Sequence, residues 1–443
     1  MMGLRVRTRT WPRVRGGRLA LPALLVVLAV AVTTVLLRPG DRAPSASAGQ
    51  SGAPKECVLQ YQVVKCTVLD VNGTPVRYAL LPGTSARGTA VLVDLGGPGL
   101  AAFGEHWVPG LREALPPELA RRSLLLLEEP WVTADAGDGS CTRALSDWFV
   151  ASHDEQPTEG TLGPCRPQLQ DASFGWTPKR YRDVVDAVST AEHIRVDTLL
   201  GRSFAGERFS YLQNSLRQIV LVDPSPKSMS SAAFLTGREQ AVLGVLAAAC
   251  PTCGGPQGVA DRLDAAAAEV RRAPIPVGGR SVALKATDVA MAAIAVAYNP
   301  VDRRAEMLAA VLAPRTAPAL VGGLADSIWQ RYGRTSVSPA YLAYLREVCA
   351  AYPGWSQVRA GGVAVAGAFL ALHAPCTQNL VPVAKKGNGP SGEICVVSHA
   401  ADPVVPAGSP ATWSSLQRVR LVLVPPGPHG DPAAAAACGR KEN

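Results

Sequence analysis

Short apolar runs and amphipathic segments alternate along the first half of the chain. Four mostly apolar runs have the length and composition of strands buried on both faces: residues 89–95, 123–127, 196–200 and 218–222. Upstream, residues 58–69 and 76–81 form two further apolar stretches around the Asn72-Gly73 pair. Because this dipeptide favours a tight turn, the region is predicted to be a β-hairpin.

A helix is predicted between the second and third of the four runs. Thr177 is a favourable capping residue, and Pro178 suits the first helical position because its missing N–H needs no partner there. Val184 and Val188 follow at helical spacing. The preceding residues, 134–175, show neither period and are predicted to be a loop.

The pattern changes after the fourth run. Ala- and Leu-rich segments of helical period follow, separated by Pro and Gly: residues 259–272, 287–298, 303–312 and 339–351. Strand patterns return at 393–398 and 418–424. The chain is therefore predicted to be an α/β protein whose mostly parallel sheet is interrupted by an inserted helical lid.

These patterns predict four parts of the chain: residues 1–48 an N-terminal segment, 49–227 the first part of the core, 228–381 the lid insertion, and 382–443 the second part of the core. With 47% hydrophobic and 18% charged residues, the chain can bury a large core.

The net charge of +9 lies mostly in the N-terminal segment. Residues 1–48 hold eight Arg and one Asp, which leaves 36 basic and 34 acidic groups, a net charge of +2, for the remainder. This balance argues against a nucleic-acid partner. Six of the Arg precede the uncharged stretch 19–37, the pattern of an export signal.

The export signal has two interpretations. The stretch 19–37 is about long enough to span a bilayer, which favours a retained signal anchor. Ala46-Ser47-Ala48 resembles a signal-peptidase site, which favours a cleaved signal peptide and a secreted protein. Contact with a membrane is expected only through this segment, if it is not cleaved.

Ten cysteines, an even number in an exported chain, predict disulfides. Four local pairings are candidates: Cys57 with Cys66, Cys141 with Cys165, Cys250 with Cys253, and Cys349 with Cys376. The spacing alone leaves the full connectivity open.

The segment from Gly201 to Gly206 contains the candidate nucleophile, Ser203. It follows an apolar strand pattern and precedes a helix-compatible segment, 207–213. A strand that turns sharply into a helix presents one side chain above the edge of a sheet, and small neighbours allow that turn. Serine also needs a base to remove its proton and a third group to orient that base.

His429 is the predicted base, because it lies in a Pro/Gly-rich loop directly after the last strand pattern. Asp402 is the predicted acid, since it follows the preceding strand and would meet His429 at the same sheet edge. Asp223, at the end of an earlier strand, is the alternative acid. His399 and His193 are interpreted as structural residues. The order Ser, Asp, His along the chain is that of the α/β-hydrolases.

An oxyanion hole is predicted from two backbone N–H groups. One belongs to Phe204, the residue after the nucleophile, and the other to Gly97 in the Gly96-Gly97-Pro98-Gly99 turn. Gly97 is preferred because Pro98 has no N–H.

These motifs, together with Asp402-Pro403-Val404-Val405-Pro406 and His429-Gly430, resemble the tripeptidyl aminopeptidase/prolyl iminopeptidase group of secreted α/β-hydrolases. The resemblance covers roughly residues 55–440. It implies an α/β-hydrolase fold in which Ser203, Asp402 and His429 are the nucleophile, acid and base. It also implies cleavage of short pieces from peptide N-termini, with a cap that selects a free amino group.

The sequence departs from the group at several positions. Arg202 and Ala205 replace glycines around the nucleophile, and residues 128–131 lack the Arg and Gly of the turn that braces the oxyanion loop. Arg202 is a candidate substrate-binding residue. Glu239 in the lid is another, because a cap carboxylate would pair with a substrate ammonium group.

The sequence thus predicts an exported serine hydrolase, an exopeptidase that acts through an acyl-enzyme on a peptide or small acyl substrate. Two alternatives remain: an esterase or amidase for a small molecule, and an envelope-bound binding protein with a weakened site. No metal or organic cofactor is expected, because no His/Asp/Glu cluster has ligand spacing and no phosphate-binding loop occurs.

Overall fold

The computed structural model describes residues 55–59, 62–84, 88–99, 111–131, 139–153, 160–171, 175–212, 216–280, 282–329, 331–332, 336–337, 340–358, 364–378, 393–414, 416 and 418–439. The predicted export signal and the stretch 19–37 lie outside these residues. Within them, no helix combines the length and the apolar character that a membrane crossing requires.

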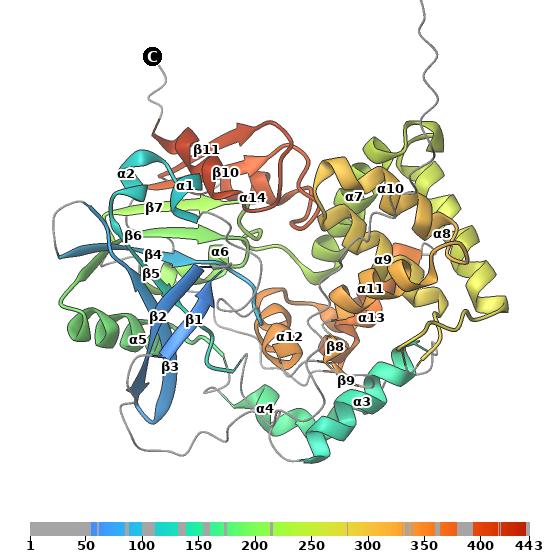
Figure 1. The fold of residues 1–443 in the computed structure, drawn as a ribbon, viewed down its shortest axis with the longest axis horizontal. Coiled ribbons are helices and arrows are strands. Elements are labelled where there is room, and N and C mark those ends of the chain that lie inside the picture. Colours follow the sequence, from blue (N-terminus) through green and yellow to red (C-terminus); the bar gives the residue numbers. More distant parts are fainter. Residues whose placement is uncertain are drawn as a thin grey trace, which may run out of the picture. The chain divides into compact units, whose positions relative to one another are not determined.

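The described strands form a nine-stranded sheet with the order β1-β2-β3-β5-β4-β6-β7-β10-β11 (Figure 1). Its members are β1 (Lys55–Leu59), β2 (Gln62–Val71), β3 (Thr74–Leu81), β4 (Thr89–Asp94), β5 (Ser123–Leu127), β6 (Arg195–Arg202), β7 (Gln218–Val222), β10 (Ile394–His399) and β11 (Val419–Val424). Each strand pattern predicted from the sequence overlaps strands of this sheet, and the single stretch predicted over 58–69 covers parts of two of them, β1 and β2. Six of the strands, from β5 to β11 in sheet order, pair in parallel. The first three pair antiparallel with one another, and β3 joins β5 antiparallel.

The two faces of the sheet are covered by different helices. Leu92 and Leu125 point to the face covered by α5 (Pro178–Ala191), whereas their neighbours point to the face covered by α1 (Leu111–Ala114) and α2 (Pro117–Ala120). This alternation follows from the two-residue period of a strand. Since both faces are covered, the central strands are mostly apolar, as their sequences predict. In β6 the buried Asp197 and Thr198 are exceptions, and both accept hydrogen bonds from Arg122.

Helix α5 begins where its sequence predicts. The Thr177 side chain accepts a hydrogen bond from the N–H of Arg180 at 3.2 Å, and Pro178 occupies the first turn. Val184 and Val188 are fully buried against the sheet. The N-cap at Thr177 and the buried positions Val184 and Val188 are therefore consistent with the same helix start and the same buried face.

The prediction of a loop over residues 134–175 is wrong. This region contains α3 (Gly139–His153), the 3₁₀ turn η1 (Gly163–Cys165) and α4 (Arg166–Gln170). Trp148 of α3 stacks on Tyr341 at 4.7 Å between ring centroids and packs edge-on against Trp329. Because these partners lie far along the chain, packing rather than local periodicity stabilises the helix.

Between β7 and β10 the described chain is helical apart from the two-stranded ladder of β8 (Arg331–Tyr332) and β9 (Ser336–Val337). The helices are α7 (Ser231–Ala249), α8 (Gly255–Arg272), α9 (Ala286–Tyr298), α10 (Val301–Leu312), α11 (Pro318–Trp329), α12 (Ala340–Ala351) and α13 (Ala364–Thr377), with 3₁₀ turns η3 (Pro251–Cys253) and η4 (Trp355–Gln357). Helix α9 is buried almost all round at the centre of their apolar cluster.

Four disulfides join described cysteines: Cys141–Cys165, Cys250–Cys253, Cys349–Cys376 and Cys395–Cys438. The first three confirm predicted pairings. The fourth was not among the local candidates, because 43 residues separate its cysteines. Cys66 is also disulfide-bonded, but the side chain of its expected partner Cys57 lies outside the described residues. Disulfides are typical of oxidising, extracytoplasmic compartments.

Candidate active site

Ser203 lies on a sharp turn between β6 and α6 (Ala205–Arg208), with φ of 50°. The turn is anchored to the next strand, because the Ser203 N–H donates to the Val222 carbonyl at 3.1 Å. A Cβ at Gly201 would lie 2.8 Å from Leu221, and one at Gly206 would lie 2.7 Å from Pro224. Positive φ at a serine is a strained conformation that is common at functional sites.

The segment after Ser203 is less helical than predicted. Helix α6 ends at Arg208 and continues as the 3₁₀ turn η2 (Phe209–Tyr211) rather than as one helix through residue 213. Ala205, which replaces a glycine of the resembled group, is buried, and its Cβ packs beside Gly201.

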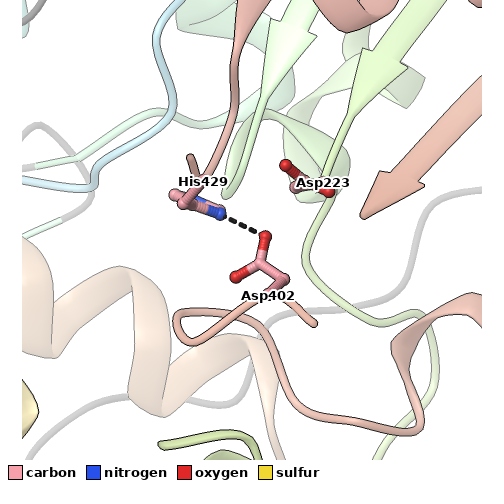
Figure 2. Close-up of side chains that lie close together, drawn as sticks. All are labelled: Asp223, Asp402 and His429. Carbon is pink, nitrogen blue, oxygen red and sulfur yellow. Dashed lines mark hydrogen bonds and ion pairs between the residues drawn. The ribbon is translucent and has the colours of Figure 1, made fainter. Parts of the chain in front are cut away.

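His429 and Asp402 lie on loops at the carboxyl ends of β11 and β10, and their side chains meet (Figure 2). His429 Nδ1 and Asp402 Oδ2 are 2.6 Å apart. The other carboxylate oxygen, Oδ1, accepts the N–H groups of Val404 at 2.6 Å and Val405 at 3.1 Å. Burial alone would raise the pKa of Asp402, but the His429 charge and these hydrogen bonds hold it below its usual range.

The second ring nitrogen of His429 is available for chemistry. Asp402 accepts from Nδ1–H, so the neutral ring carries its lone pair on Nε2. That Nε2 atom is buried and has no hydrogen-bond partner among the described residues. A buried acceptor without a partner is costly in a protein interior, and it is the state that a general base requires.

Asp223, the alternative acid, binds a different histidine. Its Oδ2 is 2.7 Å from His399 Nδ1 and also accepts the Gly430 N–H at 2.7 Å, while Oδ1 accepts the His399 N–H at 2.8 Å. Asp223 therefore holds the backbone directly after His429 but does not bind its ring. A Cβ at Gly427 would lie 2.6 Å from His399 Nε2, so His399 also packs under the loop.

Asp223, Asp402 and His429 each place one potential metal-ligating atom within 4.8 Å of the others. The hydrogen bonds described above already occupy the two carboxylates: Asp223 binds His399 and Gly430, and Asp402 binds His429. Two histidine–carboxylate pairs thus account for this cluster without a metal role.

Arg202 points toward the same loop. Its side chain is 5% exposed, Nη2 donates to the His429 carbonyl at 3.3 Å, and a Cβ at Gly430 would lie 2.7 Å from Nε. Burial lowers the pKa of Arg202 to about 10, although the nearby charges of Asp223 and Asp431 oppose that shift. These contacts place the bulky Arg202 guanidinium behind the backbone of the His429 loop.

The Gly96–Gly99 loop, which contains the predicted oxyanion donor Gly97, packs directly on the turn at Ser203. A Cβ at Gly96 would lie 2.9 Å from the Phe204 nitrogen and 3.0 Å from Ser203 Cβ. Such distances are too short for any side chain, so only glycine allows this approach. The structure thus brings Gly96, the neighbour of the predicted oxyanion donor Gly97, against the backbone of the other predicted donor, Phe204.

A buried ion-pair network braces this loop. Gly99 N–H donates to Glu129 Oε2 at 2.7 Å, and Gly96 N–H donates to Asp94 Oδ1 at 2.8 Å. The Arg208 guanidinium joins the two carboxylates, at 3.2 Å to Asp94 and 2.5 Å to Glu129, and also donates to the Gly96 carbonyl at 3.1 Å. Glu129 lies in the stretch 128–131, and Arg208 is the arginine that contacts it.

The network extends to the insertion through Glu347 of α12. Arg208 lies 2.9 Å from Glu347, and Tyr181 donates to Asp94 at 2.7 Å. Burial raises the pKa of Glu347 to about 8, although the Arg208 charge opposes this shift. Sequence reasoning missed Arg208 and Glu347, because nothing local in either segment indicates that they pair.

Glu239, the predicted ligand for a substrate ammonium group, is half-buried on α7. Burial and the charge of Asp264 on α8 raise its pKa. The residues just before Glu239 face the loop of the candidate acid: the Gly237 carbonyl accepts the Ala407 N–H at 3.2 Å, and a Cβ at Gly237 would lie 2.7 Å from Pro406.

No known protein-family profile matches the sequence, and no curated protein is similar to it. Solved structures are similar to this chain, but only at low sequence identity and low TM-score. A proline iminopeptidase from Mycobacterium smegmatis is 13% identical with a TM-score of 0.32, and the match covers 82% of this chain and 91% of that one. A proline iminopeptidase-related protein from Thermus thermophilus is 13% identical with a TM-score of 0.34, covering 85% and 94%. A haloalkane dehalogenase from Agrobacterium tumefaciens is 11% identical with a TM-score of 0.33, also covering 85% and 94%.

The strand order and directions, and the turn at Ser203 between β6 and α6, define an α/β-hydrolase fold. The predicted fold class is confirmed. The similar structures differ in their named activities and resemble this chain too weakly to indicate its substrate.

Proposed function

We propose that this protein is a serine hydrolase in which Ser203 is the nucleophile, His429 the general base and Asp402 the acid. One observation carries the proposal: a serine at positive φ on the strand–helix turn, combined with a His–Asp pair at the ends of the last two strands. An α/β-hydrolase uses these three positions for acyl transfer.

The mechanism follows from the hydrogen bonds. His429 Nε2 takes the Ser203 proton as Oγ attacks the substrate carbonyl, and Asp402 stabilises the imidazolium that forms. Protonated His429 then donates this proton to the leaving group, which leaves an acyl-enzyme. Water activated by His429 releases the acyl group in the second half of the reaction.

The backbone N–H groups of Phe204 and Gly97 are proposed to stabilise the developing oxyanion. Each such donor contributes about 10²–10³ in rate. The Glu129–Arg208 network supports this assignment, because it fixes Gly96 and Gly99 on both sides of Gly97. The same network weakens the case for a binding protein with a damaged site, since the lost Arg and Gly are replaced by another brace.

We infer from the motif resemblance that the substrates are peptides and that short N-terminal pieces are released after export. The disulfides support export, because such bonds persist in oxidising compartments. Glu239 is the proposed ligand for the substrate amino group.

A second candidate is an esterase or amidase with a small substrate. One observation favours it: the buried arginines Arg238 and Arg304 lie on the lid helices α7 and α10. Burial lowers the pKa of Arg304, although the charge of Asp402 opposes this shift. Cations near the site do not attract a substrate ammonium group.

Labelling with a fluorophosphonate probe tests the serine hydrolase. We expect stoichiometric modification of Ser203 in the wild type and no modification in Ser203→Ala, with the modified peptide identified by mass spectrometry. If the folded wild type is not labelled, both enzymatic candidates are wrong.

Paired substrates distinguish the two candidates. Aminoacyl- and tripeptidyl-anilides are compared with their N-acetylated forms and with p-nitrophenyl esters of short acids. An exopeptidase prefers anilides with a free amino terminus, an esterase hydrolyses only the esters, and an amidase hydrolyses anilides without preference for the free amine. Glu239→Gln is expected to reduce only the preference for the free amine. Equal rates on free and acetylated anilides would contradict the aminopeptidase.

A further inference from the structure

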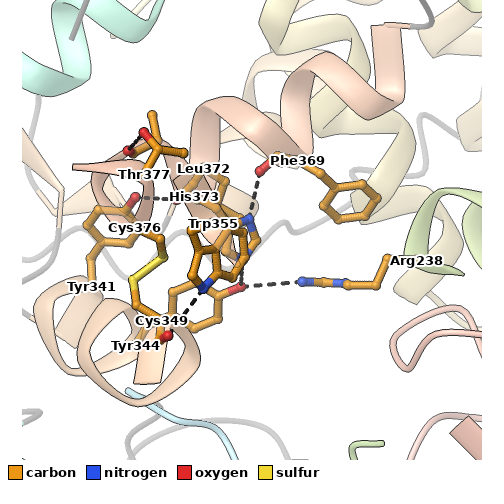
Figure 3. The surroundings of a disulfide bond; sticks show 11 residues. Arg238, Tyr341, Tyr344, Cys349, Trp355, Phe369, Leu372, His373, Cys376 and Thr377 are labelled. Atoms are coloured by element: carbon orange, nitrogen blue, oxygen red, sulfur yellow. Dashed lines mark hydrogen bonds between the residues drawn. A yellow bond between two sulfur atoms is a disulfide. The ribbon is translucent and has the colours of Figure 1, made fainter. Parts of the chain in front are cut away.

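Arg238 of α7 is a buried cation without a carboxylate partner among the described residues. It is 8% exposed, and its Nε atom is buried without a hydrogen-bond partner. Its guanidinium lies over the ring of Phe369 at 4.5 Å (Figure 3). It also lies near the ring of Phe234, at 5.5 Å. Buried charges are normally paired, because an unpaired charge costs several kcal/mol.

The polar partners of Arg238 are neutral. Nη1 donates to the Tyr344 hydroxyl at 3.3 Å, and Nη2 donates to the Tyr298 hydroxyl. Tyr344 lies 2.7 Å from His373 Nε2, while His373 Nδ1 lies 2.6 Å from the Phe369 carbonyl. Because that carbonyl can only accept, Nδ1 carries the proton, and Tyr344 O–H therefore donates to Nε2.

His373 does not supply a compensating charge. Burial and the Arg238 charge lower the pKa of His373 to about 3, so its ring is neutral at physiological pH. The chain of donors therefore runs from Arg238 through Tyr344 and His373 to a backbone carbonyl. It orients the guanidinium and leaves its positive charge uncompensated.

Two backbone contacts and one shared apolar cluster place the Arg238 cluster near the candidate active site. Gly237, the neighbour of Arg238, packs on Pro406 in the loop of Asp402. The Tyr344 nitrogen would lie 3.3 Å from a Cβ at Gly99 in the oxyanion loop.

Arg238 therefore lies next to two backbone positions that contact the acid loop and the oxyanion loop, those of Gly237 and Tyr344. Phe204, the residue directly after Ser203, is buried in the same large apolar cluster as Phe234 and Phe369.

We propose that Arg238 binds a carboxylate of the substrate next to the reacting acyl group. The guanidinium would form charge-assisted hydrogen bonds with the carboxylate, and the buried setting strengthens them. The Tyr298 hydroxyl adds a donor, since its oxygen accepts from Arg238 and its proton has no acceptor among the described residues. The carboxylate supplies the counter-charge that the protein itself lacks.

This proposal rests on the proposed serine hydrolase and names its substrate class. The carboxylate belongs either to a small dicarboxylic half-ester or to an acidic side chain of a peptide. In both cases the shared chemistry is one negative charge close to the scissile carbonyl.

Ligand binding tests the subsite without relying on turnover. Monomethyl glutarate and dimethyl glutarate are titrated by calorimetry into the Ser203→Ala protein, which retains Arg238. We expect the acid to bind about 10- to 100-fold more tightly than the diester, as charged hydrogen bonds imply. Equal affinities overturn the proposal, and this comparison needs no substitution at Arg238.

Substitutions in the same Ser203→Ala background then identify the residue. Arg238→Met is expected to remove the preference for the acid, and Arg238→Lys to retain part of it. Arg262→Met, at an exposed arginine of α8, is the matched control and should keep the full preference. A full preference in a folded Arg238→Met protein would also overturn the proposal.

Kinetic comparisons distinguish the two sources of the carboxylate. The ratio of kcat/KM for p-nitrophenyl hemiglutarate over p-nitrophenyl butyrate reports a small half-ester, and the ratio for glutamyl- over glutaminyl-peptide anilides reports an acidic peptide. One ratio is expected to exceed about 10 and to fall in Arg238→Met. If Ser203 is not labelled by the fluorophosphonate, the serine hydrolase fails, but the calorimetric result still decides the carboxylate site.

Discussion

Two carboxylates fix the position of His429, one through its ring and the other through the backbone of the next residue. Asp402 binds ring atom Nδ1, whereas Asp223 binds the N–H of the next residue, Gly430. Ring orientation and backbone position are thus set independently. In sequence both aspartates follow strands, and only their order relative to His429 favours Asp402 as the acid; the hydrogen bonds show that Asp402 contacts the ring.

Asp402→Asn tests the ring contact. An asparagine preserves shape but favours the wrong tautomer of His429, so we expect kcat to fall by about 10⁴-fold, as in other Ser-His-Asp sites. Steady-state kinetics on the best ester or anilide provides the measurement, with thermal unfolding to show that the variant is folded. A fall below tenfold would contradict the role of Asp402.

His399→Gln tests the second pair through stability. Burial alone would lower the pKa of His399, but the hydrogen bond and charge of Asp223 outweigh it and raise the pKa. The pair therefore contributes fully below the unfolded pKa of about 6.5 and loses its contribution as pH rises through the folded pKa.

The difference in unfolding free energy between wild type and His399→Gln should accordingly be largest near pH 5 and shrink at alkaline pH. Urea denaturation at several pH values measures it. A difference that grows with pH would show that His399 is not held as a charged partner of Asp223.

At the scale of elements, the buried guanidinium of Arg208 joins three parts of the molecule: the oxyanion loop, the nucleophile turn and helix α12. Three carboxylates contact it: Asp94, Glu129 and Glu347. Three ionised carboxylates around one cation would repel one another, so one carboxylate is expected to keep its proton. This agrees with the raised pKa of Glu347. The lid is thereby coupled to the site through charge.

Glu347→Gln tests this coupling. Between pH 4.5, the ordinary pKa of a glutamate, and a pH of about 8, Glu347 of the folded wild type keeps a proton that the unfolded chain has released. Stability should therefore fall as pH rises across this window, by about 1 kcal/mol per pH unit.

In the Glu347→Gln protein, whose side chain at this position is neutral, the free energy of unfolding should change less between pH 5 and 8 than in the wild type. Chemical denaturation gives the curves, and Asp186→Asn, at an exposed position of α5, is the matched control. Parallel slopes for wild type and Glu347→Gln would mean that Glu347 does not hold the proton.

Local patterns predicted the strands and α5 well, because their periods, caps and turns lie within short windows. Helix α3 escaped prediction since its buried tryptophan, Trp148, finds partners only in the insertion. Sequence order was enough to place Ser203, Asp402 and His429 as candidates. Arg208–Glu347 and Arg238–Tyr344 were missed, because such pairs exist only once distant helices pack.

At the scale of the whole molecule, the Cys395–Cys438 disulfide closes a loop that contains both Asp402 and His429. It joins β10 to the 3₁₀ segment η5 (Pro432–Cys438) that follows the His429 loop. The bridge therefore limits how far the acid and base can separate from the sheet.

Replacing both cysteines by serine should reduce the unfolding free energy by up to about 4 kcal/mol, from the loop-entropy relation applied to a separation of 43 residues. Guanidinium denaturation measures this. The Cys250–Cys253 pair, which closes a loop of only 3 residues, is the control and should cost less. Equal losses would contradict the loop-length argument.

The position of the acid and base also fixes when the proposed site can form. Ser203 and both predicted oxyanion donors are synthesised before the insertion, but Asp402 and His429 come after α13, and Cys438 follows them. A nascent or still reduced chain therefore carries a nucleophile without a secured base. In the proposed enzyme, competence for acyl transfer would therefore arise only after the two parts of the core on either side of the insertion have come together, and the Cys395–Cys438 bridge would then keep the acid and the base near the sheet.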